Sequence, residues 1–402
     1  MAGRAGKVFE KFMKNIIVVG TGFSGAVIAR GIAEELGYKV RIIERRSHIG
    51  GNMYDEVDLD GILVQKYGPH IVCTDHYKVL TYLKKYSDFF KHTVKLLSFI
   101  DGEYMRLPFN FETLQQLVGP EQSEQLIAKM RDTFKGRDRV SVLELIESKD
   151  DGISAYGTML FEKAYKPYII KQWDIPSDKI DRSVIDRVQM AMSYDERYMN
   201  YDFQYLPTNG FTKLFENLLN HCNISLSLND DALKHISLDE KSLKVYYDNE
   251  IVDCLVFTGM IDELLNLKYG VLPYRSLDIT YDHYKESSVL PEAIVSYPQA
   301  AGYTRKTEYR KMMLDDSKAN GSVVATEYPV PHQREGNITP YYPMLTTESQ
   351  ANYKSYFGEI SKYKNVFLCG RLAEFKYYNM DKCILNAFDV FEQVKYYLKE
   401  IS

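Results

Sequence analysis

The N-terminal part of the chain alternates short apolar runs with an amphipathic stretch. Asn15–Val19 is apolar and β-branched, which predicts a buried parallel strand. Apolar residues then recur at helical spacing from Ala26 to Leu36, and Gly37 is placed to end that helix. Lys39–Ile43 repeats the strand pattern. The pattern therefore predicts a strand, a helix and a second, parallel strand.

The middle of the chain is predicted to be mostly helical. Leu97–Ile100 and Glu103–Leu107 first form an expected hairpin around Asp101-Gly102. Helical periodicity with many charges follows from Phe111 to about Ser148 and resumes over Phe161–Lys171. We interpret residues 112–185 as a helical insertion.

The second half is rich in short strands. Residues 275–345 are expected to form an antiparallel sheet, and an amphipathic helix is expected over Met380–Leu398. The β-rich runs are 225–228, 243–247, 254–257, 277–280 and 323–326.

A glycine-rich turn joins the first strand to the first helix. Gly20-Thr21-Gly22-Phe23-Ser24-Gly25 matches GxGxxG, and Glu44 ends the second strand. Glycines let the backbone approach a pyrophosphate at the helix N-terminus, and a carboxylate at the position of Glu44 can accept ribose hydroxyls. The alternative is an α/β turn that binds nothing. The expected cofactor contacts here are Gly20, Gly22, Phe23, Ser24, Glu44 and Arg45.

By analogy with glutathione-reductase-type proteins, a second glycine pair after the acidic strand favours FAD over NAD. Gly50-Gly51-Asn52 supplies it. The strand ending at Gly370 and the helix starting at Met380 can also bring a helix N-terminus to the flavin, although that helix could be a plain packing element. The further cofactor contacts expected are Gly51, Asn52, Gly370, Arg371, Asn379 and Met380.

These elements predict an α/β fold: a Rossmann-like FAD-binding domain with a helical insertion domain and an antiparallel β-sheet domain. The FAD-binding domain is discontinuous, formed by 15–85, 207–265 and 355–402. The helical domain is 112–185. The sheet domain combines 90–111, 186–206 and 270–350.

Composition narrows the class of protein. The 402 residues carry 50 Lys and Arg against 55 Asp and Glu, a net charge of −5, which disfavours a nucleic-acid partner. No apolar run reaches the ~18 residues of a membrane span, so no membrane insertion is expected. Five cysteines without a CxxC pair, and an N-terminus without an apolar signal core, favour a cytoplasmic protein with no metal site.

Tyrosine is the residue that stands out, with 33 copies against one Trp. Tyr and Arg recur together in motifs far from the glycine-rich loop. Arg pairs with phosphate and aromatic rings offer a face to a base, so the motifs suit a phosphorylated, stackable ligand. Taken singly, each Tyr could simply pack and each Arg could form an ion pair. The motifs are 66–70, 107–110, 168–173, 269–277, 302–305, 327–329, 340–343 and 370–380, with Arg187 and Tyr198.

The combination of Gln172-Trp173, Tyr274–Leu277, Pro340–Pro343 and Gly370–Met380 resembles the bacterial UDP-galactopyranose mutase family, over nearly the whole chain from about Asn15. The resemblance implies an FAD-dependent isomerase that interconverts pyranose and furanose forms of a nucleotide sugar, most simply UDP-galactose. The product would serve cell-surface polysaccharides such as O-antigen or capsule.

The resemblance also implies roles for individual residues. Tyr168 and Trp173 would contact the nucleotide, and Arg187 and Arg305 would grip its pyrophosphate. His70 would lie in a loop beside the flavin, and Cys73 would border the sugar. The remaining substrate contacts implied are Tyr198, Arg275, Tyr342 and Tyr377, and Arg371 would lie on the flavin side.

In the mechanism that the resemblance implies, N5 of the reduced flavin attacks the anomeric carbon and displaces the nucleoside diphosphate. The flavin–sugar adduct opens and recloses through another hydroxyl, and the diphosphate reattaches. The family also implies an external electron donor, either NAD(P)H or a reductase, and a homodimer.

The sequence departs from the family pattern at four places. Cys73 replaces a second His, Asp174 and Met260 replace a usual Gly and Pro, and Asn379 replaces a usual Asp. The sugar therefore stays open between galactose and another nucleotide sugar: dTDP-fucose, UDP-N-acetylgalactosamine or a GDP- or UDP-heptose. Two other classes remain: an oxidoreductase of the FAD-linked amine-oxidase type, and a flavoprotein scaffold that binds a nucleotide sugar without converting it.

Overall fold

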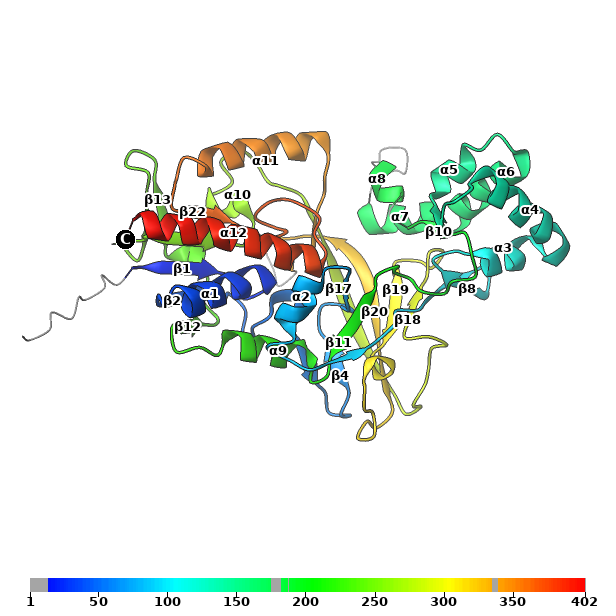
Figure 1. Cartoon of the computed structure of the whole chain (residues 1–402), viewed down its shortest axis with the longest axis horizontal. Helices are drawn as coiled ribbons and strands as arrows, with labels where there is room; N and C mark the ends of the chain where they lie inside the picture. The colour runs from blue at the N-terminus through cyan, green and yellow to red at the C-terminus, as the bar shows by residue number, and fades with distance from the viewer. Residues whose placement is uncertain (1–13, 175–181, 187, 335–338, 402) are drawn as a thin grey trace, which may run out of the picture. The chain divides into compact units, whose positions relative to one another are not determined.

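The computed structural model describes residues 14–174, 182–186, 188–334 and 339–401. The chain divides into two compact units, each assembled from separate stretches of sequence (Figure 1). The first unit comprises 1–51, 212–272 and 347–402, and the second comprises 52–211 and 273–346.

A five-stranded parallel sheet forms the centre of the first unit, in the order β12-β2-β1-β16-β22. In register, Val19 of β1 pairs with Ile43 of β2 and with Phe257 of β16. Their carboxyl ends therefore meet at one edge, where open α/β sheets bind ligands. The strands are β1 Ile16–Val19, β2 Val40–Ile43, β12 Ile224–Ser227, β16 Cys254–Phe257 and β22 Val366–Leu368.

Two helices of the first unit pack tightly on each other. They are α1, Phe23–Glu35, and α12, Met380–Glu400. A Cβ added at Gly31 would lie 2.8 Å from the Phe391 ring, so glycine allows this close approach (Figure 1). The unit also holds α10 Ile261–Leu264, α11 Thr347–Ile360, η4 Ala232–Lys234, and a small sheet of β13 Ile236–Asp239, β14 Lys244–Tyr247 and β15 Glu250–Ile251.

A seven-stranded sheet organises the second unit, in the order β21-β17-β20-β19-β18-β7-β8. The predicted antiparallel pairing holds except between β18 and β7, which pair in parallel. A long connection separates these two strands, so they need not run in opposite directions. The strands are β7 Leu96–Ile100, β8 Glu103–Leu107, β17 Tyr274–Tyr284, β18 Ile294–Ser296, β19 Arg305–Glu308, β20 Ser322–Pro331 and β21 Tyr342–Pro343.

The predicted helical insertion is present in the second unit. Two of its helices illustrate polar caps: Asn110 accepts from the Thr113 N–H at the start of α3, and Ser141 forms a capping box with Glu144 at the start of α5. The helices are α3 Phe111–Val118, α4 Pro120–Thr133, α5 Val142–Ile146, α6 Asp151–Leu160, the π-helical turn η2 Phe161–Tyr165, α7 Lys166–Trp173 and α8 Arg182–Ile185. The short strands β9 Arg139–Val140 and β10 Met190–Ala191 pair beside them.

Three smaller groups complete the second unit. They are β3 Asp55–Val57 with β4 Leu63–Gln65; β5 Val72–Thr74, β11 Phe203–Pro207 and β6 Phe89–Lys91; and the helical segments η1 Gly51–Met53, α2 Tyr77–Leu83 and η5 Tyr309–Met312. Helix α9, Gly210–Leu219, begins in the second unit and belongs to the first unit from Thr212 onward.

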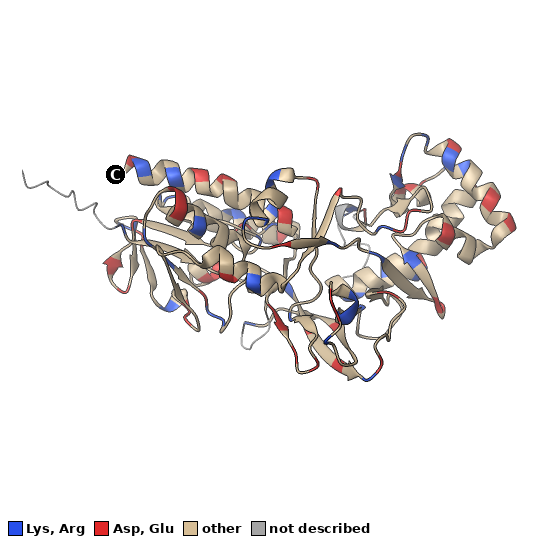
Figure 2. Cartoon of the chain, turned by 60° about the horizontal axis from the view of Figure 1, so that its bottom comes forward, with Lys and Arg blue, Asp and Glu red and all other residues tan. Residues whose placement is uncertain are grey.

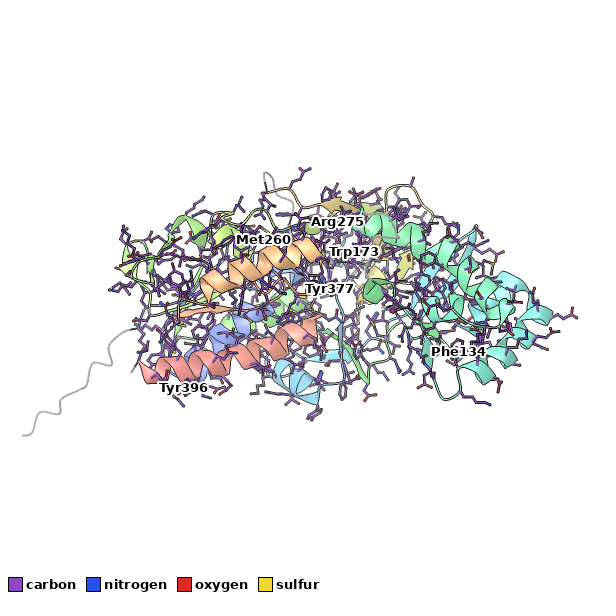
Figure 3. All side chains as sticks on the ribbon, turned by 90° about the horizontal axis from the view of Figure 1, so that it is seen from above. Phe134, Trp173, Met260, Arg275, Tyr377 and Tyr396 are labelled. Carbon is purple, nitrogen blue, oxygen red and sulfur yellow. The ribbon has the colours of Figure 1, made fainter. Side chains whose placement is uncertain are left out.

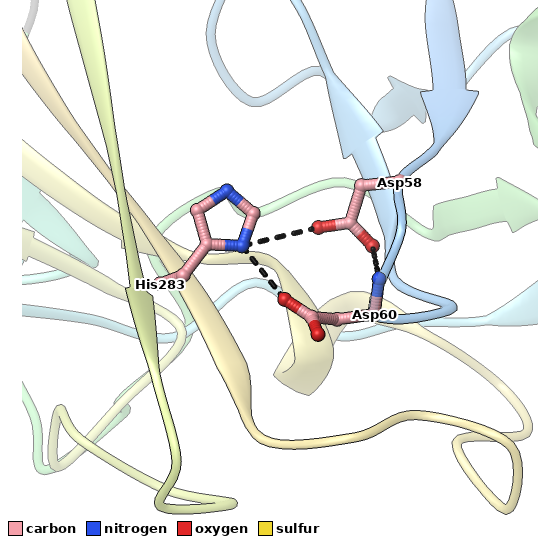
Figure 4. Close-up of side chains that lie close together, drawn as sticks. All are labelled: Asp58, Asp60 and His283. Carbon is pink, nitrogen blue, oxygen red and sulfur yellow. Dashed lines mark hydrogen bonds and ion pairs between the residues drawn. The ribbon is translucent and has the colours of Figure 1, made fainter.

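The turn between β3 and β4 is tied to β17 by a small polar cluster (Figure 4). His283 Nδ1 lies 2.7 Å from Asp60 Oδ2 and 3.7 Å from Asp58 Oδ2. Asp58 Oδ1 accepts the backbone N–H groups of Asp60 and Ile62 within the turn. These ligand-type atoms lie within 4.8 Å of one another, and we interpret the group as a hydrogen-bonded cluster that holds the turn against β17.

The two observed units differ from the three predicted domains. Residues 52–85 were expected in the cofactor domain, but they group with the second unit. The reason is pairing: β5 joins β11, and Asp55 accepts the Phe211 N–H at 2.6 Å. The predicted helical and sheet domains also fall in this one unit.

Charge is distributed over both units in the same way. Basic and acidic residues alternate along the elements, in keeping with the small net charge of −5 (Figure 2). Within the described residues, no helix combines the length and apolar character that crossing a membrane requires.

Candidate active site

The glycine-rich turn of the first unit is shaped by close backbone contacts. Gly20 has φ +96°, and a Cβ there would lie 2.2 Å from Thr258 Oγ1. A Cβ at Gly25 would lie 1.9 Å from the Gly20 carbonyl oxygen. Both glycines are therefore required by the protein itself, because any side chain would open the turn or displace α1.

Gly22 differs from its neighbours. A Cβ added there would meet no protein atom within 4 Å, although Gly22 is the N-cap of α1. The protein's own packing does not require glycine at this position, whereas a phosphate approaching the helix N-terminus does. The turn therefore fits a bound pyrophosphate.

Two further glycine turns meet this one inside the first unit. A Cβ at Gly51, which has φ +59°, would lie 3.2 Å from the Gly22 Cα. A Cβ at Gly370, which has φ +95°, would lie 2.5 Å from Ser24 Oγ. The structure thus brings Gly20–Gly25, Gly51 and Gly370 together around the start of α1, as an extended dinucleotide would need. Asn52 follows directly but is grouped with the second unit.

Glu44 is buried and closes the turn. Its Oε2 accepts from the Thr21 N–H at 3.1 Å and the Thr21 hydroxyl at 2.8 Å, and its Oε1 accepts from the Arg46 N–H at 3.1 Å. Oε2 thus accepts two hydrogen bonds and Oε1 accepts one, so Oε1 keeps a second lone pair for a ribose hydroxyl. Arg45 is partly exposed and lies 3.5 Å from Glu263. The Phe23 side chain packs on Phe215, so its backbone N–H is the group left for a ligand.

The segment from Gly370 to α12 holds the remaining cofactor candidates. Arg371 donates to the Tyr378 carbonyl at 2.6 Å, and its guanidinium lies 5.4 Å from the centre of the Tyr377 ring. Asn379 is the N-cap of α12, its side chain makes no capping hydrogen bond, and Met380 begins the helix. The N–H groups of the first turn therefore point to whatever lies before the helix.

In the second unit, Arg305 is held by a buried carboxylate. Glu327, 2% exposed, accepts from Arg305 Nε at 2.9 Å and from Nη2 at 2.7 Å, a forked pair. Burial alone would lower the pKa of Arg305, but Glu327 outweighs it and the pKa lies above its usual value. Nη1 takes no part in the pair and is placed to donate to a ligand.

Two tyrosines lie near this arginine, and a tryptophan lies beside one of them. Tyr168 and Tyr342 both lie close enough to Arg305 to act on its charge, and the Trp173 ring lies 6.4 Å from the Tyr342 ring. Tyr168 and Trp173 come from α7, and Tyr342 comes from β21. Three segments far apart in sequence thus bring together a fixed guanidinium and a group of aromatic rings.

Arg275 has a different environment from the one expected. It lies beside Trp173 at the end of α7 (Figure 3) and is 2% exposed. Its Nε donates to the Gln172 carbonyl at 2.9 Å and its Nη2 to the Lys171 carbonyl at 3.3 Å. Its donors satisfy carbonyls that the helix end leaves open, so it supports α7.

Asp174, one of the departures from the family pattern, is the C-cap of α7. Its φ of 57° and ψ of 34° are left-handed, a conformation that glycine adopts most easily. Its carboxylate lies 3.5 Å from Arg275 Nη1 and is 74% exposed. This position requires a residue that can adopt the left-handed conformation, and Asp adopts it more easily than most residues.

The Gln65 side chain hydrogen-bonds both the backbone N–H and the backbone carbonyl of His70. The His70 N–H donates to Gln65 Oε1, and Gln65 Nε2 donates to the His70 carbonyl at 3.2 Å. Tyr309, fully buried, donates its hydroxyl to the Gln65 carbonyl at 2.8 Å. His70 Nδ1 lies 2.8 Å from the Gly68 carbonyl, which accepts a hydrogen bond from the Nδ1–H group.

The other expected substrate contacts are less closely tied to Arg305. Cys73 is half-buried in β5 and pairs with Gln204 of β11. Tyr198 lies on the segment whose backbone meets Val94, near Tyr165. Tyr377 belongs to the first unit, and Arg187 lies outside the described residues.

Three supporting residues were missed by sequence reasoning: Glu327, Gln65 and Lys171. Glu327 stood in a noted motif, but only the fold shows that it faces Arg305 across β19 and β20. The sequence did contain one indication of this role: Glu327 is an acidic residue in an apolar strand, and a buried charge needs an oppositely charged partner.

The chain is similar to known proteins over almost its whole length. Residues 163–377 match the family described as UDP-galactopyranose mutase, and residues 18–86 match an NAD(P)-binding Rossmann-like domain. The chain is 33% identical to dTDP-fucopyranose mutase of Escherichia coli, covering 94% of this chain and 97% of that one. It is 32% identical to a probable UDP-galactopyranose mutase of Klebsiella pneumoniae, covering 93% of each.

Among solved structures, reduced UDP-galactopyranose mutase aligns with a TM-score of 0.69 at 14% identity, covering 95% of this chain and 94% of that one. A putrescine oxidase variant aligns with a TM-score of 0.57 at 14% identity, covering 95% and 99%. These two likenesses establish the fold alone. Sequence identity above 30% over almost the whole length, together with the family match across the Arg305 region, establishes that the chain belongs to the UDP-galactopyranose mutase family.

Proposed function

We propose that the protein interconverts the pyranose and furanose forms of a nucleotide sugar, with UDP-galactose as the first candidate. One observation carries this proposal: Arg305, oriented by buried Glu327, lies near Tyr168 and Tyr342, and the Trp173 ring lies beside the Tyr342 ring. A guanidinium matches a diphosphate and the rings match a base. Family membership supplies the isomerase chemistry.

FAD is the cofactor we infer. The support is the meeting of Gly22, Gly51 and Gly370 at the start of α1, with Glu44 buried beside them. Gly22 and Gly51 would lie against the pyrophosphate, and Glu44 would accept from a ribose. When bound and reduced, the flavin supplies the nucleophile for the anomeric carbon. The N-terminus of α12 favours negative charge on the group that lies before it.

Arg305 is proposed to stabilise the charge that develops on the departing diphosphate. Its Nη1 is available because Glu327 occupies the other two nitrogens, so the side chain is oriented before the ligand arrives. Tyr342 and Tyr168 would add hydroxyl donors near the same charge. Arg187, Tyr198 and Tyr377 stay proposed phosphate contacts.

The roles of two nearby side chains follow from their environments. His70 is proposed to lie beside the flavin, with its ring oriented by the hydrogen bond from Nδ1 to the Gly68 carbonyl. Arg275 is proposed to act indirectly, by holding the end of the helix that carries Trp173.

The identity of the sugar is tested by measuring which nucleotide sugar the enzyme converts. The dithionite-reduced protein is incubated with UDP-galactofuranose and, separately, with dTDP-fucofuranose, and chromatography follows the pyranose products. The second substrate is included because a dTDP-fucopyranose mutase is as similar as a UDP-galactopyranose mutase, and Cys73 departs from the family pattern. Conversion of either confirms mutase activity. Flavin re-oxidation matching product formation one to one would instead indicate an oxidoreductase.

The setting of the reaction is also a proposal. Family resemblance supports an external electron donor, NAD(P)H or a reductase, that reduces the flavin once, and a homodimer. Five cysteines without a CxxC pair support a reducing, cytoplasmic location.

A further inference from the structure

Lys171 makes three hydrogen bonds to backbone carbonyls, and none of the proposed substrate or cofactor contacts involves this residue. It lies on α7, three residues after Tyr168 and two before Trp173. Its Nζ donates to the carbonyl oxygens of Tyr297 and Ala300, each at 2.7 Å, and of Tyr303 at 2.8 Å. An ammonium group has three N–H donors, so all three are satisfied by one short segment of backbone.

This arrangement is costly for a cation. Lys171 is half-buried, and burial lowers its pKa to about 8. Within the part of the chain that the structure describes, no carboxylate forms an ion pair with it. A lysine that is merely a surface residue would extend into water. The three carbonyls are therefore the reason that the ammonium stays in place.

The segment that Lys171 holds leads directly into the arginine pair. Residues 297–304 connect β18 to β19, and β19 begins at Arg305. The Thr304 N–H donates to the Glu327 carbonyl at 2.9 Å, and the Tyr297 N–H to the Thr304 carbonyl at 2.8 Å. Lys171 is thus linked through backbone to both members of the Arg305–Glu327 pair.

From the other side, Arg275 binds the last carbonyls of the same helix. Two basic residues therefore hold the carboxyl end of helix α7. Lys171 extends from the helix to the carbonyls of residues 297–303, and Arg275 of β17 donates to carbonyls of the helix.

We propose that Lys171 is a positioning residue that sets the distance between the base-contacting face of α7 and the diphosphate-contacting Arg305. The inference rests on the proposed function, because it assigns the base and the diphosphate to these two groups. A nucleoside diphosphate bridges both, so it binds well only when their spacing is fixed.

The test compares Lys171→Met with Lys166→Met in the FAD-loaded protein. Lys166 lies on the same helix, but it is exposed and pairs with Glu162. Both changes remove one charge and keep an apolar stem. Trp173 is the single tryptophan, so its fluorescence reports binding of UDP and of dTDP to α7.

For Lys171→Met we expect the dissociation constant of the preferred nucleotide and the KM to rise by about tenfold, the scale of one lost charge-assisted contact. We expect kcat to stay within about twofold, since the groups at the reacting carbon are unchanged. Lys166→Met should behave as wild type in all three measurements.

The outcomes separate the two proposals. If wild type binds a nucleotide but converts no sugar, the proposed function fails, and the binding constants alone still test Lys171. Unchanged affinity and KM in Lys171→Met would overturn the inference. A fall in kcat and Tm with unchanged affinity would overturn it too, because that indicates a purely structural residue.

A second variant applies if Lys171→Met does not fold with FAD. Lys171→Arg keeps the charge, but a planar guanidinium cannot direct donors to three carbonyls around one point. We expect an intermediate rise in the dissociation constant, and wild-type affinity in this variant would contradict the proposal.

Discussion

At the scale of single residues, the proposed ligand contacts are oriented by other protein groups. Arg305 is fixed by Glu327, Arg275 is engaged with α7, and His70 is held by Gln65. The sequence allowed these ligand contacts to be proposed because their motifs are distinctive. It could not indicate their partners, since Glu327 and Gln65 meet them only after distant strands pair.

Arg305→Ala should reduce kcat/KM by more than about 100-fold, because it removes the proposed diphosphate contact. FAD content should be retained, since the glycine turns belong to the first unit. Removing the arginine also leaves Glu327 buried and unpaired, at a cost of about 3–5 kcal/mol in stability. Arg305→Lys, which retains a cation for Glu327, is the control for stability. Wild-type activity in Arg305→Ala would refute the phosphate assignment.

Gln65→Leu should lower kcat while leaving the dissociation constant of UDP or dTDP unchanged. The change removes both hydrogen bonds to the His70 backbone, so the imidazole loses its fixed position. An unsatisfied buried N–H costs about 1–3 kcal/mol, so Tm should also fall. Stopped-flow turnover and Trp173 fluorescence measure the two quantities separately. An unchanged kcat would remove His70 from the reaction.

At the scale of elements, the helices and strands that long periodic patterns predicted are present. The first strand, α1, the β7–β8 hairpin and α12 appear within a few residues of their expected positions. The parallel β18–β7 pair was missed, because pairing direction depends on tertiary structure. The π-helical turn before α7 was missed as well. Pro167 near the start of α7 lacks an N–H and disturbs the regular helix there.

The glycine turn at the start of α1 can be tested with two substitutions. Gly22→Val should abolish FAD binding and leave the apoprotein folded, because a side chain there enters space that the protein does not fill. Gly25→Ala should instead impair folding, since its Cβ would overlap the Gly20 carbonyl. Absorbance at flavin wavelengths and circular dichroism distinguish these results. A Gly22→Val protein that purifies with one FAD per chain would show that the turn does not hold the pyrophosphate.

The end of α7 gives a prediction about a family departure. Asp174→Gly should leave stability unchanged or raise it by up to about 1 kcal/mol, because glycine adopts the left-handed C-cap without strain. The ion pair that it loses is largely exposed and contributes little. Sugar preference should not change. A switch of preference between UDP- and dTDP-sugars would show that Asp174 determines specificity.

At the scale of the whole molecule, the chain is built from two units that interleave in sequence. Residues 52–211 and 273–346 are inserted between parts of the parallel-sheet unit. The sequence predicted this interruption but divided the insertions into two domains. Local patterns could not reveal that the helices and the seven-stranded sheet share one unit, because β7 and β8 join that sheet from far away in sequence.

The central claim is that the bond between the sugar and the diphosphate breaks during each turnover while the diphosphate is retained. Positional isotope exchange tests it most directly. The preferred nucleotide sugar is labelled with oxygen-18 at the atom that joins the anomeric carbon to phosphorus, and phosphorus NMR follows the label. With reduced enzyme we predict that the label moves to non-bridging positions as fast as the ring forms interconvert, and that oxidised enzyme leaves it in place. A label that stays in the bridge throughout complete interconversion would contradict the account.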